Sequence, residues 1–257
     1  MNKPKVVFEE RDFLVIDKPT GMVVNRADTV AAGITVQDWV ETKNQKHQIS
    51  SKSQDPSLKA FFDRSGIVHR LDKETSGLLL IAKNPQAFYN LQSQFKERKV
   101  EKKYLALVHG KIAPEEGEIK APVGRLPWNR ERFGVFPGGR EAVTKYKLLS
   151  VFSIARSVSG QPVKPITEYS LLEVIPQTGR THQIRVHLKY AGHPVVGDLF
   201  YAGRKTARED RKFCPRLFLH AIFLRITHPT KGTILEFKSA LPKDLQSVLD
   251  RLPDYFN

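Results

Sequence analysis

Apolar residues at the start of the chain come in short runs that polar residues separate. Residues 6–8 and 13–17 are largely apolar, and the charged segment 9–12 lies between them. Short runs joined by a polar turn predict a β-hairpin, and Pro19 and Gly21 predict its end. The first predicted element is therefore a pair of antiparallel strands.

Two segments show the apolar spacing of a helix behind a capping residue. Residues 35–44 begin with Thr35 as the cap, and a second segment follows Asn84 and Pro85. Asn caps a helix through its side chain, and Pro is well tolerated at the first helical position. Each helix is predicted to pack one face on the core. The apolar positions are Val36, Trp39 and Val40 in the first helix and Phe88, Leu91 and Phe95 in the second.

Further apolar runs are spread over the rest of the chain. Strands are predicted over residues 77–83, 102–110, 117–123, 142–152, 168–176, 217–227 and 233–238, and helices over 181–190 and 242–252. Many strands with helices placed irregularly among them favour an α+β fold with a largely antiparallel sheet.

One segment interrupts this pattern. Residues 43–59 are rich in Lys, Gln and Ser and carry few apolar side chains. Such a composition predicts a mobile loop. We therefore interpret residues 43–64 as a polar insertion within a single domain that spans residues 1–257.

The charge of the chain favours a polyanionic partner. The 257 residues include 42 Lys and Arg against 27 Asp and Glu, which gives a net charge of +15. Nucleic acid is the first candidate for such an excess, and a merely solubilising surface or an anionic lipid partner is the alternative. The hydrophobic content of 40% is enough for a proper core.

Other compositional features concern the cellular setting. No run of 18 apolar residues occurs, which excludes a membrane-spanning helix. Residues 1–5 lack the apolar stretch of a signal peptide, so a cytoplasmic location is expected. Cys214 is the only cysteine, which rules out an internal disulfide and fits a reducing compartment.

The segment 67–80 carries the most chemistry. Asp72 lies just before an apolar run, with Arg70 two residues before it and Lys73 directly after it. A nearby cation can lower a carboxylate pKa by about 1–3 units, so Asp72 is expected to be ionised. An ionised, positioned carboxylate can act as a nucleophile, a general base or an electrostatic clamp. Taken alone, a surface ion pair at a strand entrance is the commoner structure.

This segment and three others resemble the RluA-type pseudouridine synthases, in which the Asp of the HRLD motif is catalytic. The four segments are Asp17–Val24, Ile67–Leu80, Lys103–Val108 and Gly179–Leu188, the last continuing to Gly192–Pro194 and Gly197–Asp198. Smaller similarities follow at residues 219–221 and 228–229. One departure is Asn25-Arg26, where many relatives carry His and Pro. The motifs lie on both sides of the insertion, which is why we place it within one domain.

The resemblance implies a fold and a reaction. The fold would be a long, bent, mostly antiparallel mixed sheet, flanked by helices and crossed by a central basic cleft. Many relatives carry a small basic N-terminal domain, and we expect this chain to lack such an S4-like RNA-binding domain. The reaction would isomerise uridine in RNA to pseudouridine: the N-glycosidic bond breaks, the uracil turns and a C–C bond forms. Nothing is gained or lost, so neither a redox cofactor nor a metal is expected. His182 and His187 are five residues apart, which does not give the one-face pair of a helical zinc motif.

The resemblance also implies a catalytic set of Asp72, Tyr104 and Arg185. Asp72 would attack the ribose C1′ or the uracil ring, or act along a glycal route, and the sequence leaves these alternatives open. Arg185 would lie beside Asp72 and hold it ionised, and Tyr104 would lie against the uracil. Without the family, Tyr104 could equally be a core tyrosine on an amphipathic strand, and Arg185 could belong to a solvated helix face.

The target base lies in a stack or a pair, so the enzyme must flip it out at a cost of a few kcal/mol. Contacts to RNA phosphates and to the flipped base would offset this cost. Segment 124–140 is predicted as an RNA-gripping loop, because arginines contact phosphates and an indole can stack on a base. Its candidates are Arg125, Trp128, Arg130, Arg132 and Arg140, and weaker candidates elsewhere are Lys18, Lys73, Arg180 and Lys189. Arg70 is expected to contact the RNA by helping to open the helix or by filling the space of the extruded base.

Two other functions compete with a synthase. An RNA-binding factor could keep the fold without turnover, but the intact Asp72, Tyr104 and Arg185 set argues against this. A glycoside hydrolase would need a second carboxylate opposite Asp72. Glu74 and Asp198 are better explained as a surface charge and a turn residue. The expected partner is ribosomal or transfer RNA, bound by a monomer.

Overall fold

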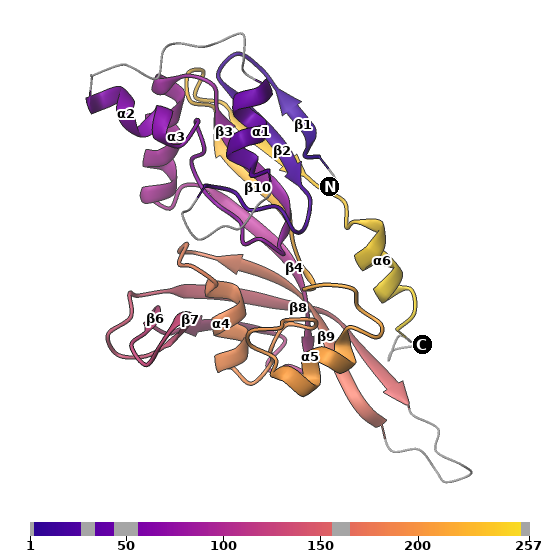
Figure 1. Ribbon diagram of the computed structural model, residues 1–257. Helices are drawn as coiled ribbons and strands as arrows, with labels where there is room; N and C mark the ends of the chain where they lie inside the picture. The colour runs from indigo at the N-terminus through magenta and orange to yellow at the C-terminus, as the bar shows by residue number, and fades with distance from the viewer. Residues whose placement is uncertain (1–2, 27–33, 44–55, 156–164, 253–257) are drawn as a thin grey trace. The chain divides into compact units, whose positions relative to one another are not determined.

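The structure is a computed structural model that describes residues 3–26, 34–43, 56–155 and 165–252 (Figure 1). Contacts within the chain divide it into two compact units. Unit 1 comprises Met1–Glu101 and Phe223–Ser239, and unit 2 comprises Lys102–Ile222 and Ala240–Asn257. The interpretation of the chain as one domain stays a prediction.

The strands of unit 1 follow the order β1-β2-β3-β10, and β11 pairs with β10. The pairs β1–β2, β2–β3 and β10–β11 are antiparallel. The predicted N-terminal hairpin is therefore confirmed as β1 and β2. The bounds of the strands are Lys5–Glu9 (β1), Phe13–Lys18 (β2), Ser76–Ala82 (β3), Leu219–Thr227 (β10, of which the part from Phe223 belongs to this unit) and Ile234–Lys238 (β11).

Three helices belong to unit 1: α1 (Val36–Lys43), α2 (Pro56–Asp63) and α3 (Pro85–Lys96). The predicted start of α3 is confirmed, since the Asn84 side chain accepts a hydrogen bond of 2.9 Å from the backbone N–H of Ala87. In the core of this unit, Phe13 and Val15 of β2 pack with Leu78 and Leu80 of β3 and with Phe88 and Leu91 of α3.

Helix α2 corrects the prediction that residues 43–59 form a loop, because it begins at Pro56. The polar insertion that we predicted at 43–64 thus contains a helix, and its residues 44–55 lie outside the described part of the chain. An apolar group near the end of α2 explains the helix. Phe61 packs into the unit 1 core, where its ring meets that of Phe88 at 5.6 Å in an edge-to-face arrangement.

The chain after α2 must pass very close to β3. Gly66 has a φ of +77°, and a Cβ there would lie 2.0 Å from the Ala82 carbonyl oxygen. The Gly66 carbonyl accepts a 2.8 Å bond from the Ala82 N–H, and Ile67 bridges to Ile81. Only glycine fits this approach, which fixes where the segment bearing Asp72 begins.

The strands of unit 2 follow the order β10-β4-β9-β8-β5, and β6 and β7 form a separate two-stranded sheet. The pairs β4–β9, β8–β9, β5–β8 and β6–β7 are all antiparallel, so the predicted α+β class with a mostly antiparallel sheet is confirmed. The bounds are Glu101–His109 (β4), Glu116–Lys120 (β5), Val123–Leu126 (β6), Asn129–Val135 (β7), Val143–Ala155 (β8) and Pro165–Pro176 (β9).

We predicted residues 124–140 as a loop. Most of them instead belong to the β6–β7 hairpin (Val123–Val135). One side of the hairpin is buried, although the many arginines of this segment suggested an exposed loop. Val123, Ala142, Val186 and Tyr201 form a small core, and Phe133 and Val135 pack against it. This packing attaches the hairpin to helix α4.

The helices of unit 2 are α4 (Gln183–Tyr190), α5 (Arg204–Asp210) and α6 (Lys243–Leu249). Helices α4 and α6 lie where the sequence predicts them. Helix α5 was not predicted, because Ala207 is its only buried apolar residue and no apolar face signals it. In the part of the chain that the structure describes, none of the helices has the length and apolar character needed to cross a membrane.

Candidate active site

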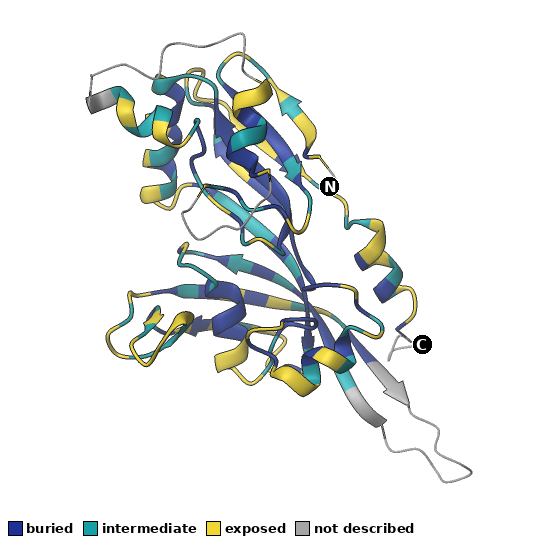
Figure 2. Ribbon diagram, viewed as in Figure 1, coloured by how far each residue is buried: buried dark blue, intermediate teal, exposed yellow. Residues whose placement is uncertain are grey.

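Asp72 lies on a loop that leads from Gly66 into strand β3. Its side chain is half-buried, whereas the flanking Arg70 and Lys73 are exposed. Behind the loop, every residue of β3 is buried, and the strand is dark blue in Figure 2. The carboxylate therefore stands at the edge of a rigid strand, as predicted, and the exposed cations remain available for the predicted RNA contacts.

Main-chain hydrogen bonds hold this loop at three successive carbonyl groups. The Asp72 carbonyl accepts from the Thr75 N–H at 3.2 Å, and the Lys73 carbonyl accepts from the Gly21 N–H at 2.8 Å. The Glu74 carbonyl accepts from the Thr20 hydroxyl at 2.8 Å. The turn after β2 thus fixes the backbone that carries Asp72.

The buried residue Lys18 connects the same two segments, the turn after β2 and the Asp72 loop. Its side chain is fully buried, and its Nζ donates to the carbonyl oxygens of Pro19 (2.9 Å), Met22 (2.8 Å) and Lys73 (3.2 Å). An ammonium has three N–H donors, and here three carbonyls accept. This burial does not support the RNA contact that we predicted for Lys18, which instead acts as an internal clamp on the Asp72 loop.

His69 ties the loop to β3 on another side. The backbone N–H of Leu80 donates to His69 Nε2 at 2.9 Å, so Nε2 is unprotonated and Nδ1 carries the proton in the neutral ring. The imidazole also stacks on Phe95 of α3, with 4.6 Å between ring centroids. We predicted no role for the histidine of the HRLD motif, and in the structure it supports the loop.

Replacing Lys18 with Met is expected to loosen the Asp72 loop. A buried carbonyl left without a donor costs about 1–3 kcal/mol, so the free energy of unfolding should fall by about that amount. Amide hydrogen exchange at residues 72–75 should become faster. Lys73→Met is the matched control, because the Lys73 side chain is exposed and its loss should change stability by no more than about 0.5 kcal/mol. Equal effects of the two variants would contradict the clamp.

In unit 2, Arg185 of α4 is locked to Asp198. Its Nε donates to Asp198 Oδ2 at 2.7 Å and its Nη2 to Oδ1 at 2.9 Å, and the two side chains are 4% and 0% exposed. Two parallel bonds between a guanidinium and a carboxylate fix both groups. Arg185 is therefore half of a buried ion pair, and Asp198 is its partner rather than only the turn residue that we predicted.

Aromatic rings complete the surroundings of Arg185. The guanidinium carbon lies 4.9 Å from the Tyr201 ring centroid and 5.7 Å from that of Phe200. The Tyr201 hydroxyl is 2.7 Å from His182 Nδ1 and accepts from the backbone N–H of Phe133 in β7. The predicted placement of Arg185 beside Asp72 joins residues of the two units and stays a prediction.

The other polar residues of α4 form an internal network. Gln183 Nε2 donates to the Val143 carbonyl and to Thr144 Oγ1, each at 3.0 Å, and Gln183 Oε1 accepts from Thr178 Oγ1. Thr144 Oγ1 lies 2.9 Å from His187 Nδ1, and His187 Nε2 lies 3.0 Å from the Ala121 carbonyl. Since a carbonyl only accepts, Nε2 carries the proton. These residues of the motif therefore hold α4 on the sheet.

Protonation of His187 is expected to destabilise the fold. Burial lowers the pKa of His187 below its ordinary value of 6.5, against a smaller opposing effect of the hydrogen bond to Ala121. The unfolded chain therefore binds this proton more readily, and the free energy of unfolding should fall as the pH drops below about 6.5, by at most about 1.4 kcal/mol per pH unit.

Urea unfolding between pH 7.5 and 5 would measure this effect. His187→Gln has no titrating ring, so the difference between wild type and variant isolates the contribution of His187 from those of other groups. The wild type should lose more stability than the variant as the pH falls. Parallel profiles would contradict the prediction.

The remaining predicted residues lie on unit 2. Tyr104 is a buried residue of β4 that pairs with Val174 of β9. Arg180 is half-buried, and its Nε donates to the Glu141 carbonyl at 3.2 Å. On the β6–β7 hairpin, Trp128 is 75% exposed, and Arg125, Arg130 and Arg132 are exposed too, as is Arg140 just after the hairpin. The hairpin thus presents the cations and the indole that RNA contacts require.

A group of potential metal ligands lies elsewhere in unit 1, where Glu10, Asp12 and His228 have ligand atoms within 4.8 Å of one another. His228 Nδ1 accepts from the backbone N–H groups of Thr230 and Lys231, each at 3.1 Å. A neutral imidazole with an accepting Nδ1 carries its proton on Nε2. That nitrogen lies 2.7 Å from Glu10 Oε1 without hydrogen-bond geometry, and because it carries the proton it does not offer a lone pair to a metal.

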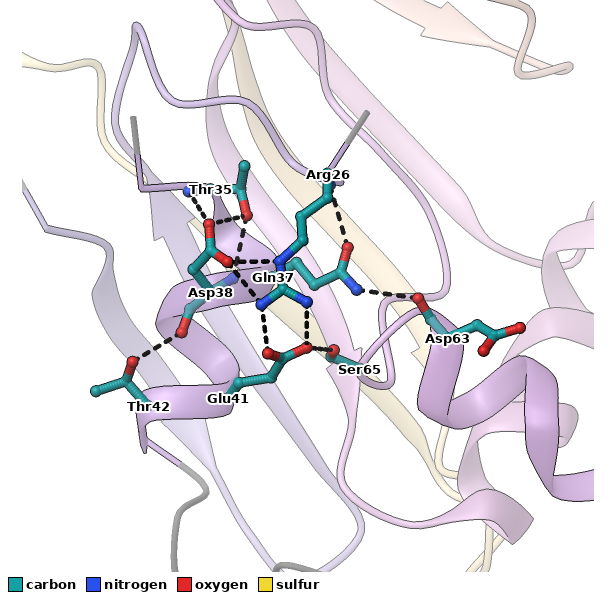
Figure 3. A network of polar contacts seen from close by, with 8 residues as sticks. All are labelled: Arg26, Thr35, Gln37, Asp38, Glu41, Thr42, Asp63 and Ser65. Carbon is teal, nitrogen blue, oxygen red and sulfur yellow. Dashed lines mark hydrogen bonds and ion pairs between the residues drawn. The ribbon is translucent and has the colours of Figure 1, made fainter. Parts of the chain in front are cut away.

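Arg26, which departs from the family pattern, anchors helix α1. Its Nε donates to Asp38 Oδ1 at 2.6 Å and its Nη1 to Glu41 Oε1 at 3.0 Å (Figure 3). At the start of the helix, Thr35 Oγ1 accepts from the Asp38 N–H, and Asp38 Oδ2 accepts from the Thr35 N–H. This reciprocal pair is a capping box, with Asp in place of Glu. Arg26, where this chain departs from the family pattern, thus has acidic partners on helix α1.

Comparisons with known proteins bear on the family of this chain. The family described as RNA pseudouridylate synthase matches residues 12–190, which include the Asp72 loop, Tyr104 and Arg185. The chain belongs to the RNA pseudouridylate synthase family. The enzymes of this family are isomerases, so the predicted family and the predicted enzyme class are confirmed.

Individual relatives lead to the same family. The chain is 43% identical over 238 residues to an uncharacterized RNA pseudouridine synthase of Chloroflexus aurantiacus, which covers 93% of this chain and 66% of the relative. It is 37% identical over 252 residues to the ribosomal large subunit pseudouridine synthase D of Nitrosomonas europaea, covering 96% of this chain and 65% of that protein. The chain thus spans about two thirds of the length of these relatives.

Among solved structures, human RNA pseudouridylate synthase domain containing 1 is similar with a TM-score of 0.68 and 30% identity, over 98% of this chain and 89% of that one. A pseudouridine synthase fold is therefore shared along almost the whole length of the chain.

Proposed function

We propose that this chain converts uridine to pseudouridine in ribosomal or transfer RNA, with Asp72 as the nucleophile toward a flipped-out nucleotide. The observation that carries the proposal is the Asp72 loop. Its carboxylate belongs to the family motif, and the backbone at 72–74 is fixed by hydrogen bonds at every carbonyl. A nucleophile held in one geometry lowers the entropic cost of attack.

The reaction needs no exchange with other molecules. The N-glycosidic bond breaks, the uracil rotates, and C5 bonds to the ribose carbon that N1 has left. C5 loses its proton and N1 gains one, so the atoms balance. Asp72 forms and then releases a bond to the substrate while this happens. In the proposed reaction, Tyr104 lies against the uracil and accepts the proton that leaves C5, and Arg185 orients the Asp72 carboxylate.

Features of unit 2 support the roles of Tyr104 and Arg185. Arg185 is held in one orientation by Asp198, which suits a residue that must aim a charge. Tyr104 is buried on a strand that pairs with β9, so its ring has little freedom. A cytoplasmic, monomeric enzyme with these residues remains our prediction.

The substrate is proposed from the chemistry and from the relatives. The net charge of +15 and the exposed arginines of the β6–β7 hairpin suit a phosphate backbone, and Trp128 suits stacking on a base. Two relatives are named ribosomal large subunit pseudouridine synthase D. Large-subunit ribosomal RNA is therefore the first substrate to test, and transfer RNA is the second.

Mapping pseudouridine in RNA tests this function. The purified protein would be incubated with unmodified transcripts of large-subunit ribosomal RNA and of transfer RNAs, and each uridine would be probed by a pseudouridine-specific chemistry. We expect one or a few sites to become modified at substoichiometric enzyme concentration. Binding of RNA without any modified site would support an RNA-binding factor without turnover and would contradict the proposal.

A further inference from the structure

We propose that a second RNA contact surface, the α5 platform, lies on unit 2 and consists of Leu199, Phe200, Arg204, Lys205 and Arg208. Phe200 stacks on a base of the RNA, and the three cations contact its phosphates. The inference rests on the proposed function and deepens it, because it assigns a docking surface to the same RNA. Neither the sequence motifs nor the family match assigns a role to these five residues.

The platform starts with two adjacent apolar side chains in solvent. Leu199 is 52% exposed and Phe200 is 42% exposed. A single exposed apolar residue is ordinary. Two adjacent exposed apolar side chains form a small patch that water solvates poorly, and here a run of cations follows them in the chain. One side of the Phe200 ring faces Arg185, whose guanidinium carbon lies 5.7 Å from the ring centroid. The exposed part of the ring is therefore available to a ligand.

The turn that carries Phe200 is rigid. Asp198 Oδ1 accepts from the backbone N–H groups of Phe200 (2.9 Å) and Tyr201 (3.1 Å). The Asp198 carbonyl also accepts from the Ala202 N–H at 3.1 Å. Since Asp198 is itself locked to Arg185, the exposed ring is held by a buried ion pair rather than by a loose loop. A preorganised ring loses little entropy when it binds.

The same turn is fastened to helix α5. The Gly197 N–H donates to Asp210 Oδ2 at 2.8 Å, and Arg211 Nη2 donates to the Gly197 carbonyl at 3.0 Å. Gly197 has a φ of +74°, and a Cβ there would lie 2.4 Å from the Arg216 carbonyl oxygen, so the backbone has one tight path. Phe200 and the cations of α5 therefore belong to one rigid piece of unit 2.

Three exposed cations of helix α5, Arg204, Lys205 and Arg208, have no acidic partner in the part of the chain that the structure describes. On the sheet of the same unit, by contrast, Lys120, Lys145 and Lys147 each have one. Lys120 and Lys145 lie near Glu118, and Lys147 lies near Glu116. The cations of α5 are thus available to an external anion.

An exposed aromatic ring beside unpaired cations matches single-stranded RNA. Bases stack on aromatic rings in a way that tolerates any sequence, while Arg and Lys contact the backbone. An acidic protein segment would satisfy the cations but would make no use of the fixed ring. We therefore assign the platform to an RNA strand next to the target uridine.

Fluorescence anisotropy with a labelled single-stranded oligouridylate tests the platform. Phe200→Ala and Phe200→Leu should weaken binding by about 5–150-fold, because both lose the π face, whereas Phe200→Tyr should stay close to wild type. Replacing Arg204, Lys205 and Arg208 together with Gln should lower the slope of log K against log salt by about 2, at about 0.7 for each lost phosphate contact.

Two matched controls make the result specific. Tyr89→Ala removes an aromatic residue with similar exposure, 39%, from unit 1 and should not change binding. Replacing Lys120, Lys145 and Lys147 with Gln changes the net charge by the same amount on paired cations and should leave the salt slope nearly unchanged. Thermal unfolding of each variant shows whether it is folded.

The outcomes separate the platform from the proposed function. Wild-type binding and activity with unchanged binding by the Phe200 and α5 variants would overturn the platform and leave the synthase function intact. A wild-type protein that binds no RNA would overturn both. Equal losses in the α5 variant and the Lys120, Lys145 and Lys147 variant would show a general charge effect and would also overturn the platform.

Discussion

Asp72→Asn should lower the rate of pseudouridine formation by at least about 10³-fold, as expected when an enzyme loses its nucleophile. The amide has nearly the size of the carboxylate but does not act as an anionic nucleophile. The bonds that hold the loop use main-chain carbonyls, so they remain in the variant. RNA affinity and thermal stability should therefore change little, and single-turnover assays with bound RNA would measure the chemical step alone.

Glu74→Gln is the matched control for this variant. Glu74 is a half-buried carboxylate two residues away on the same loop, so its replacement makes the same change of charge. It should alter the rate by only a few-fold, since we assign it no contact with substrate. An Asp72→Asn enzyme that keeps a tenth of the wild-type rate would refute the nucleophile, as would equal losses in both variants.

The sequence predicted the elements that have a strong local pattern. The helix after Asn84 was found because the cap, Pro85 and an apolar face coincide, and the hairpin of β1 and β2 because two apolar runs flank a charged turn. Helix α5 could not be predicted from the sequence, because polar contacts at its C-terminal end hold it in place. Asp210 and Arg211 bond to Gly197, which is distant along the chain and leaves no periodic signal.

The motif residues of the candidate site could be predicted from the sequence, but the residues that hold them in place could not. Asp72, Tyr104 and Arg185 could be named because they belong to long family-like segments. The internal position of Lys18 could not be deduced, because a lysine before Pro19 is usually expected in solvent, and only the folded turn brings three carbonyls to its Nζ. Asp198 was likewise read as a turn residue, since nothing local indicates that it pairs with Arg185.

Asp198→Ala should be strongly destabilising, by about 3–5 kcal/mol, because it leaves the buried Arg185 without a counter-charge. The variant also removes the acceptor of the Phe200 and Tyr201 N–H groups, so the turn beside α5 should loosen. Chemical denaturation of unit 2, followed through amide exchange of its strands, would measure the loss. Asp198→Asn, which keeps the size of the side chain, should recover only part of it.

Asp244 offers a comparison within the same unit, because it pairs with Arg216 through the same two nitrogens, at 2.6 Å from Nε and 3.2 Å from Nη2. The Asp244 side chain is 40% exposed, whereas that of Asp198 is fully buried. Solvent reaches the Asp244 carboxylate, although the Arg216 side chain is only 7% exposed, so Asp244→Ala should cost less than Asp198→Ala, about 1–3 kcal/mol. The two ion pairs have similar geometry and differ in the burial of the carboxylate, so comparing the two variants shows the effect of that burial. A loss at Asp198 no larger than the loss at Asp244 would show that the Arg185 pair does not hold the turn.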